Sequence, residues 1–129
     1  MEIEKSKKYL TLNDIEAYFI AFNLSNYLWD IVIRWQYFQR DTVGKQFTEA
    51  VDSISANIAE GFGRYGKKDK VRFYRIAMGS TLEGVDWNNK SDVQKLLKEF
   101  QYEHIKTELD KLPRSINSLI LYTNKVLTF

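Results

Sequence analysis

The 129-residue chain contains no cysteine and only one histidine. Without cysteine it can form no disulfide bond, no thiolate zinc site and no cysteine nucleophile, and the redox compartment is left undetermined. The single histidine, His104, excludes a di-iron bundle with two Glu-x-x-His motifs and most zinc sites. A phosphate-cradling glycine loop of the Walker type is also absent. We therefore expect no catalytic residues, no metal and no cofactor, and we predict that the protein is not an enzyme.

Proline and glycine are scarce, with one and six residues, and long hydrophobic runs are missing. Turn residues do not recur at the short spacing that β-sandwiches need. The longest charge-free run, 17–29, is interrupted by polar residues and is shorter than the roughly 18 residues needed to span a bilayer. Residues 1–13 lack the apolar core of a secretory signal. We predict a single all-α domain over 1–129, a cytoplasmic location and no membrane partner.

Neither sign of charge dominates the chain as a whole, since 19 Lys and Arg residues face 17 Asp and Glu residues. The resulting net charge of +2 does not by itself indicate a nucleic-acid partner. Residues 61–75, called the basic segment below, hold six cations against one acid, a local +5 that leaves −3 for the rest. The cations are Arg64, Lys67, Lys68, Lys70, Arg72 and Arg75.

Apolar residues recur at helical spacing in four stretches, which predict helices over 12–40, 43–60, 69–98 and 102–127. Thr11 is the expected N-cap of the first helix. Its predicted apolar face is Ile15, Tyr18, Phe22, Trp29 and Val32. Because long amphipathic helices with short connections pack as antiparallel neighbours, we predict an up-and-down four-helix bundle.

The second predicted helix carries Phe47, Ala50, Val51, Ile54 and Ile58 on one face. Gly61 is expected to cap its end, and Gly61, Gly63 and Gly66 are expected to supply backbone freedom for a tight reversal. The third predicted helix shows Val71, Tyr74, Ala77, Met78, Leu82 and Val85 in helical phase. The fourth shows Ile105, Leu109, Leu112, Ile116, Leu119, Thr123 and Val126, in a phase that crosses Pro113 and predicts one kinked helix.

A polar stretch, 88–92, interrupts the third predicted helix and admits two interpretations. Ser91 and Gln94 have capping-box spacing and could begin a new helix, whereas the stretch could also be a solvated part of one long helix. We favour the continuous helix.

The run Ser-Ile-Ser-Ala-Asn-Ile-Ala-Glu-Gly-Phe-Gly-Arg over 53–64 is followed by Phe-Tyr-Arg-Ile-Ala-Met-Gly-Ser over 73–80 and by Glu83. This pattern resembles the bacterial four-helix bundle family, also called the 23S rRNA intervening-sequence protein or S23 family. The resemblance implies a left-handed bundle, a closed homo-oligomeric ring that is pentameric in known cases, and no established enzymatic activity. Distant relatives include the accessory protein of diversity-generating retroelements, which partners a reverse transcriptase and nucleic acid, so RNA becomes a candidate partner.

The resemblance breaks down at one point in the second predicted helix. Family members usually carry a basic pair just after the position of Gln46, where this chain has Phe47, Thr48 and Glu49, and Asp52 follows. If those cations line an RNA-facing surface, that surface is weakened here.

Asn57 and Glu60 in the motif admit a functional interpretation, as a paired polar site, and a structural one. In the structural interpretation, which we favour, Asn57 hydrogen-bonds between helices to fix their register, and Glu60 bonds backbone donors at the start of the next helix. Ala77, Gly79, Ser80 and Gly84 are small residues in a predicted helix. Glycine there costs on the order of 1 kcal/mol relative to alanine, which favours close approach of the helix bearing 53–57 over a ligand cavity.

The basic segment interleaves its cations with Phe62, Tyr65, Phe73 and Tyr74. Single-stranded nucleic-acid binding needs cations for phosphates and aromatic rings for stacking bases. The alternative is a solvated turn whose aromatic rings belong to the core or to a subunit interface. Further aromatic residues crowd the first predicted helix and cannot share one inward face, which predicts burial against another subunit.

These patterns lead to two functional hypotheses. The first is a non-catalytic, homo-oligomeric scaffold with RNA or single-stranded DNA as its partner through the basic segment, and with no small-molecule substrate. The second is a protein–protein interaction module or accessory subunit that binds through exposed aromatic side chains and has no nucleic-acid role.

Overall fold

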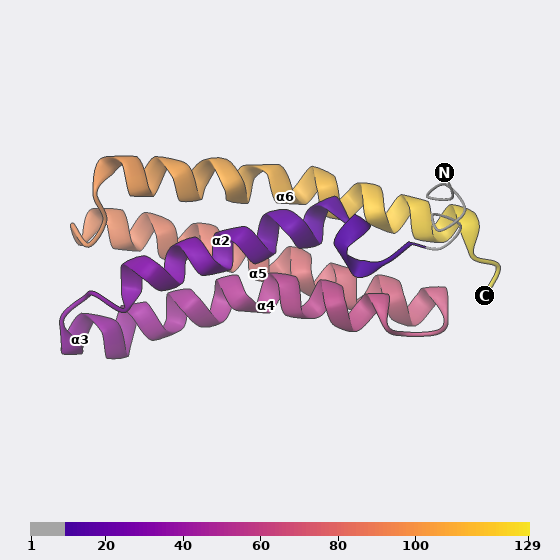
Figure 1. The fold of residues 1–129 in the computed structure, drawn as a ribbon, viewed down its shortest axis with the longest axis horizontal. Coiled ribbons are helices and arrows are strands. Elements are labelled where there is room, and N and C mark those ends of the chain that lie inside the picture. The colour runs from indigo at the N-terminus through magenta and orange to yellow at the C-terminus, as the bar shows by residue number, and fades with distance from the viewer. Residues whose placement is uncertain (1–9) are drawn as a thin grey trace, which may run out of the picture.

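The computed structural model describes residues 10–129, which form a bundle of four long helices and contain no β-strand (Figure 1). The long helices are α2 (Glu16–Val32), α4 (Lys45–Phe62), α5 (Lys67–Val93) and α6 (Glu99–Val126). A 3₁₀ turn, η1 (Leu12–Asp14), precedes α2, and a short helix, α3 (Tyr37–Gln39), and a π-helical turn, η2 (Arg40–Gly44), lead into α4. The colours in Figure 1 show each long helix running back along the one before it. The prediction of an all-helical bundle is confirmed.

The first helix is shorter than predicted, because α2 ends at Val32 and not near Arg40. Gln36 has an extended backbone, with ψ of 159°, which interrupts the helical path before α3 begins. The amides of Arg34 and Trp35 donate to carbonyls three residues back, so the last turn tightens before the chain reverses. Residues 33–40 contain no glycine or proline, so the sequence contained no stop signal at the end of α2.

The core face of α2 also differs from the prediction. Its buried residues are Ala17, Ala21, Leu24, Leu28, Ile31 and Val32. Phe22 and Trp29, predicted for the core, are 47% and 57% exposed. The prediction followed the largest side chains, whereas a parallel series of small and branched aliphatic residues lets α2 pack closely against its neighbours. Most of the aromatic side chains of α2 consequently lie outside the core.

The core face of α4 is as predicted, because Phe47, Ala50, Val51, Ile54 and Ile58 are all buried. Gly61, however, lies inside the helix and does not cap it. A Cβ atom at Gly61 would come within 2.7 Å of the Tyr74 ring, so this glycine permits close contact between α4 and α5. Gly63 is the C-cap with φ of −78°, an ordinary helical conformation. The predicted need for glycine backbone freedom in this turn was therefore wrong.

Helix α5 runs without a break through Asn88–Asp92, which confirms the continuous interpretation. It ends at Val93, five residues before the predicted end. Lys95 adopts a left-handed conformation with φ of 61°, and the amides of Lys95 and Leu96 donate to the carbonyls of Asp92 and Ser91. This pair of bonds is a Schellman motif, which stops the helix. Glycine usually occupies the left-handed position, so a lysine there gave no signal in the sequence.

The second half of α5 has a more polar core face than predicted. Leu82 is 64% exposed, whereas Thr81, Gly84, Asn88 and Ser91 are buried. A Cβ atom at Gly84 would lie 3.2 Å from Leu109, so the small residue accommodates α6. Val71, Tyr74 and Ala77 are buried as predicted, and Met78 and Val85 pack against the core from partly buried positions.

Helix α6 continues through Pro113 as one helix, as predicted. The Lys98 amide donates to the Gln101 side chain at 2.8 Å and thereby caps its start. Ile105, Leu109, Leu112, Ile116 and Thr123 are buried as predicted. Val126 is 50% exposed, and Ile120 is buried in its place. Within residues 10–129, no helix is both long and apolar enough to cross a membrane.

Candidate nucleic-acid interface

The basic segment occupies the end of the bundle that also holds the C-terminus (Figure 1). Arg64 lies in the connection that follows α4, and the other five cations lie in the first nine residues of α5. The fold therefore places all six predicted cations around one turn. The six cations differ in their ion-pair and hydrogen-bond partners. Those without a carboxylate partner are the ones best able to contact a ligand.

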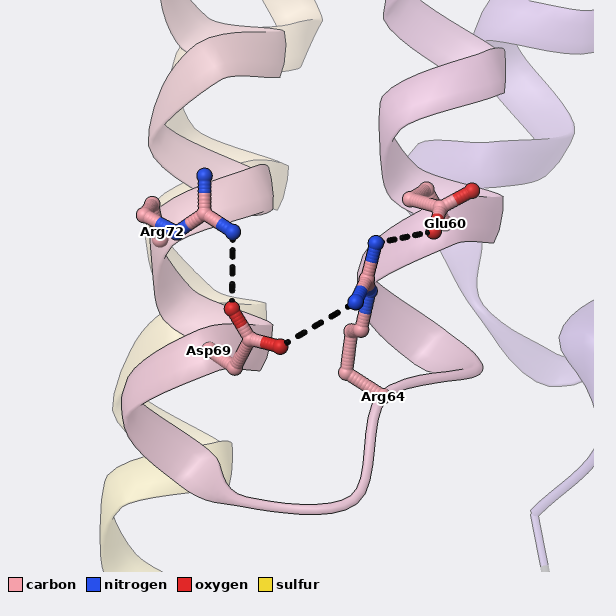
Figure 2. A network of polar contacts seen from close by, with 4 residues as sticks. All are labelled: Glu60, Arg64, Asp69 and Arg72. Atoms are coloured by element: carbon pink, nitrogen blue, oxygen red, sulfur yellow. Dashed lines mark hydrogen bonds and ion pairs between the residues drawn. The ribbon is translucent and has the colours of Figure 1, made fainter.

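Figure 2 shows an ion-pair network that joins the end of α4 to the start of α5. Arg64 contacts Glu60 at 2.6 Å and Asp69 at 3.5 Å, and Arg72 contacts Asp69 at 2.9 Å. Glu60 thus pairs with a side chain, and the prediction that it bonds backbone donors of the next helix was wrong. These side chains are 38–59% exposed, so each pair contributes at most about 1 kcal/mol of stability.

The same arginines cover an aromatic ring that was predicted as a stacking candidate. The guanidinium carbons of Arg64 and Arg72 lie 4.6 and 4.5 Å from the centre of the Phe73 ring. Phe62 is covered in a similar way, because the Lys70 ammonium lies 5.3 Å from its ring centre and donates to its carbonyl at 2.7 Å. Burial lowers the pKa of Lys70. Both rings therefore already have a cation as a neighbour.

Of the four aromatic residues in the basic segment, only Tyr65 is widely exposed, at 82%. Tyr74 belongs to the core, at 2% exposure, and its burial raises the pKa of its hydroxyl to about 12. The Tyr65 ring lies 4.9 Å from the Phe129 ring, so one neighbour borders it. Tyr65 is therefore the stacking platform that this turn offers.

Lys67 has a structural role as well as a charge. Its ammonium donates to the carbonyl of Leu127 at 3.1 Å and approaches that of Asn124 at 3.5 Å, and its amide donates to a backbone oxygen of Phe129 at 2.6 Å. These bonds fasten the segment after α6 to the start of α5. The carbonyls of Leu127 and Asn124 are neutral, so they do not cancel the positive charge of the Lys67 ammonium.

The side chains of Lys68 and Arg75 are exposed and make no ion pair or hydrogen bond with any other described residue. Six cations against the two acids of the network, Glu60 and Asp69, leave a charge of +4 on this turn. The surface can therefore attract phosphates through Lys68, Arg75 and the outer edge of Arg72.

The polar residues of the motif in α4 and α5 hydrogen-bond within the bundle, but with other partners than predicted. Asn57 donates to the carbonyl and hydroxyl of Ser53 at 2.8 and 2.9 Å, inside its own helix. The bond between helices runs instead from the Ser80 hydroxyl to the Ser53 hydroxyl, at 3.0 Å. The predicted close approach holds for Ser80 and is wrong for Gly79, which is exposed with no atom within 4 Å of where its Cβ would lie.

A groove of about 330 Å³ between α2 and α4 was not predicted. We call it the aromatic groove, lined by Tyr18, Phe22, Ser25, Asn26, Trp29, Asp52, Ser55, Ala56 and Ala59. The Ser25 hydroxyl donates to the Asp52 carboxylate across it. The aromatic crowding on α2 indicated an exposed surface, and the structure confirms that Phe19, Phe22 and Trp29 are exposed. The concave shape depends on the small residues of α4, which the aromatic pattern did not reveal.

A second hollow, of about 440 Å³, lies between the end of α2 and the start of α6. Its nine lining residues include three aromatic side chains, two cations and one acid: Tyr27, Trp35, Phe100, Arg34, Lys98 and Asp30. The Tyr27 ring lies 4.3 Å from the His104 ring, and burial raises the pKa of Tyr27. Because its charges are mixed, this hollow does not select ligands of one sign.

The chain was compared with protein families and with solved structures. A family model described as 23S rRNA-intervening sequence protein matches residues 13–118. A solved structure of a protein with unknown function from the S23 ribosomal protein family of Bacteroides thetaiotaomicron has a TM-score of 0.72 and 18% identity. The alignment covers 81% of this chain and 97% of that chain, and at this identity the likeness concerns the fold alone. No curated protein matches the chain.

Proposed function

Because the chain belongs to the 23S rRNA-intervening sequence protein family, we propose that it is a non-catalytic, homo-oligomeric scaffold that binds RNA or single-stranded DNA. The observation that supports this best is the charge of +4 gathered around the turn between α4 and α5. The family resemblance adds two expectations to the proposal, left-handed packing of the helices and a closed pentameric ring, and the sequence pattern adds antiparallel packing and a cytoplasmic location.

In the proposed mode of binding, Lys67, Lys68 and Arg72 contact phosphates and Tyr65 stacks on a base. Three phosphate contacts per copy predict a slope of about −2 when the logarithm of the binding constant is plotted against that of the salt concentration. A single turn with three contacts binds weakly. In an oligomer the turns act together, and their joint affinity exceeds that of one copy.

The test is a titration of fluorescently labelled single-stranded RNA at low and at raised salt. We expect Lys68→Glu combined with Tyr65→Ala to weaken binding at least tenfold, because it removes an unpaired cation and the exposed ring. Lys45→Glu is the matched control, since Lys45 is an exposed cation at the start of α4, away from the turn. Equal binding by the double variant and the control, or no binding by the unmodified protein at low salt, would refute the nucleic-acid role.

A second candidate function is supported by the exposed aromatic side chains of α2, two of which line the aromatic groove. Phe19, Phe22 and Trp29 are 60%, 47% and 57% exposed on α2, and such apolar surface is typical of protein interfaces. In this alternative the protein is an accessory subunit that binds another protein and has no nucleic-acid role. A partner that stays bound in a pull-down after nuclease treatment, and is lost with Trp29→Ala, would favour it over the first proposal.

A further inference from the structure

Gly79 occupies an unfavourable position for a glycine within this fold. It lies in the middle of α5, on the exposed side, and no atom lies within 4 Å of where its Cβ would be. Glycine is the least favourable helix residue after proline, and here no contact within residues 10–129 requires it. By contrast, a Cβ at Gly84 on the same helix would press on Leu109. The space above Gly79 is therefore open to a group from another molecule.

The surroundings of Gly79 form an apolar ridge on α5. Ile76 and Leu82 lie three residues to either side of it and are 43% and 64% exposed. Residues three and four apart share one face of a helix, so Arg75, Ile76, Gly79 and Leu82 lie together. Arg75 is exposed and has no ion-pair partner among the described residues. We call these four residues the α5 ridge.

The aromatic groove matches this ridge in its apolar character and in its charge. Its lining includes Ala56, a small exposed residue of α4, and Phe22 and Trp29 of α2. Asp52 is the one charged residue among the nine that line it. An apolar ridge with one cation thus matches an apolar groove with one carboxylate.

We propose that the α5 ridge of one copy of this chain docks in the aromatic groove of a second copy. In this arrangement Phe22 or Trp29 of the groove covers Gly79, and Arg75 of the ridge pairs with Asp52 of the groove. Ridge and groove lie on different helices, so the contact is heterologous and each copy can engage two neighbours, which continues into a ring or a filament. The inference rests on the homo-oligomeric part of the proposed function and is independent of nucleic-acid binding.

Two variants test each side of this contact separately. Gly79→Arg places a long side chain on the ridge and improves helix propensity, so the fold is retained. Ala56→Arg places a long side chain in the groove, and Ala56 is exposed, so the fold is retained. Gly63→Arg is the matched control, because Gly63 is exposed, has helical dihedral angles and would make only ordinary contacts, at 3.6 and 3.7 Å. Circular dichroism melts confirm folding of all three.

Sedimentation velocity then measures the oligomeric state of each variant. We expect the unmodified protein and Gly63→Arg to form the same higher oligomer, and Gly79→Arg and Ala56→Arg each to be monomeric. An equimolar mixture of the two monomeric variants retains one intact ridge and one intact groove. It should therefore form a dimer and nothing larger, a result that a heterologous contact requires.

Two results would overturn the inference. If Gly79→Arg assembles as the unmodified protein does, the ridge is not an interface. If the mixture stays monomeric although each variant is folded, ridge and groove do not contact each other. An unmodified protein that is monomeric at all concentrations would refute the homo-oligomeric part of the proposed function as well. The nucleic-acid part would not be affected, because the RNA titration tests it independently.

Discussion

The same substitution, glycine to alanine, should have opposite effects at two positions of the bundle. At Gly79 a Cβ atom meets nothing within 4 Å, so alanine should stabilise α5 by about 1 kcal/mol through helix propensity. At Gly61 a Cβ atom would lie 2.7 Å from the Tyr74 ring and 3.0 Å from the Lys70 carbonyl oxygen. The ring is buried and the carbonyl belongs to the backbone, so neither can move freely.

The magnitude at Gly61 follows from two opposing terms. Alanine gains about 1 kcal/mol of helix propensity there too, but overpacking a well-filled core costs typically 1–3 kcal/mol. We expect a net loss of about 1 kcal/mol, and hence a difference of about 2 kcal/mol between the two variants. That difference corresponds to roughly thirtyfold in the unfolding equilibrium constant, since 1.4 kcal/mol is about a factor of ten.

Urea denaturation followed by far-ultraviolet circular dichroism measures both free energies of unfolding. The two variants should be made in the Ala56→Arg background, so that self-association does not contribute to the measured stability. If Gly61→Ala proves as stabilising as Gly79→Ala, the close packing of α4 against Tyr74 is not real, and the account of Gly61 fails.

Three further predictions concern single contacts. Burial raises the pKa of Tyr74 to about 12, whereas tyrosines of an unfolded chain ionise near pH 10. Above pH 10 the unfolded chain is therefore stabilised relative to the folded protein by ionisation of this residue. Between about pH 10 and 12 the fold should therefore lose roughly 2 kcal/mol through this group, and Tyr74→Phe should flatten the pH dependence in urea melts. Lys95→Gly should stabilise the protein by up to about 1 kcal/mol, because φ at this position is 61°; an unchanged or lower melting temperature would contradict this. A double-mutant cycle of Ser53→Ala and Ser80→Ala should give a coupling of about 1 kcal/mol, and purely additive effects would exclude their hydrogen bond.

The six cations show how far the candidate site could be derived from the sequence. Their number and their confinement to 61–75 are properties of the chain order, and the fold does gather them around one turn. Two of their ion pairs, Arg64–Glu60 and Arg72–Asp69, join residues three or four apart in the sequence. The pair between Arg64 and Asp69 forms only once α5 has turned back along α4, so it could not be predicted. The same fold leaves Lys68 and Arg75 without partners among the described residues, a distinction that a count of charges does not contain.

For the aromatic residues of α2, the sequence predicted the exposure of some side chains but not which of them are exposed. Their crowding in one stretch predicted that some would be exposed, and the exposure of Phe19 and Trp29 agrees. The prediction still placed Phe22 and Trp29 in the core. Both the aromatic and the aliphatic residues of α2 recur at helical spacing, so periodicity alone did not decide which series faces inward.

The sequence by itself determined the helical class, the core face of α4, the continuity of α6 and the position of the basic segment, whereas it left two interpretations open for α5. These depend on composition and on spacing along one helix, which are local properties. Only the tertiary structure decided where α2 and α5 end, which face of α2 is buried and which cations remain unpaired. The physical reason is that an end without glycine or proline, a choice between two apolar faces and an ion pair between helices all depend on the neighbouring helix, whose position becomes known only when the bundle has formed.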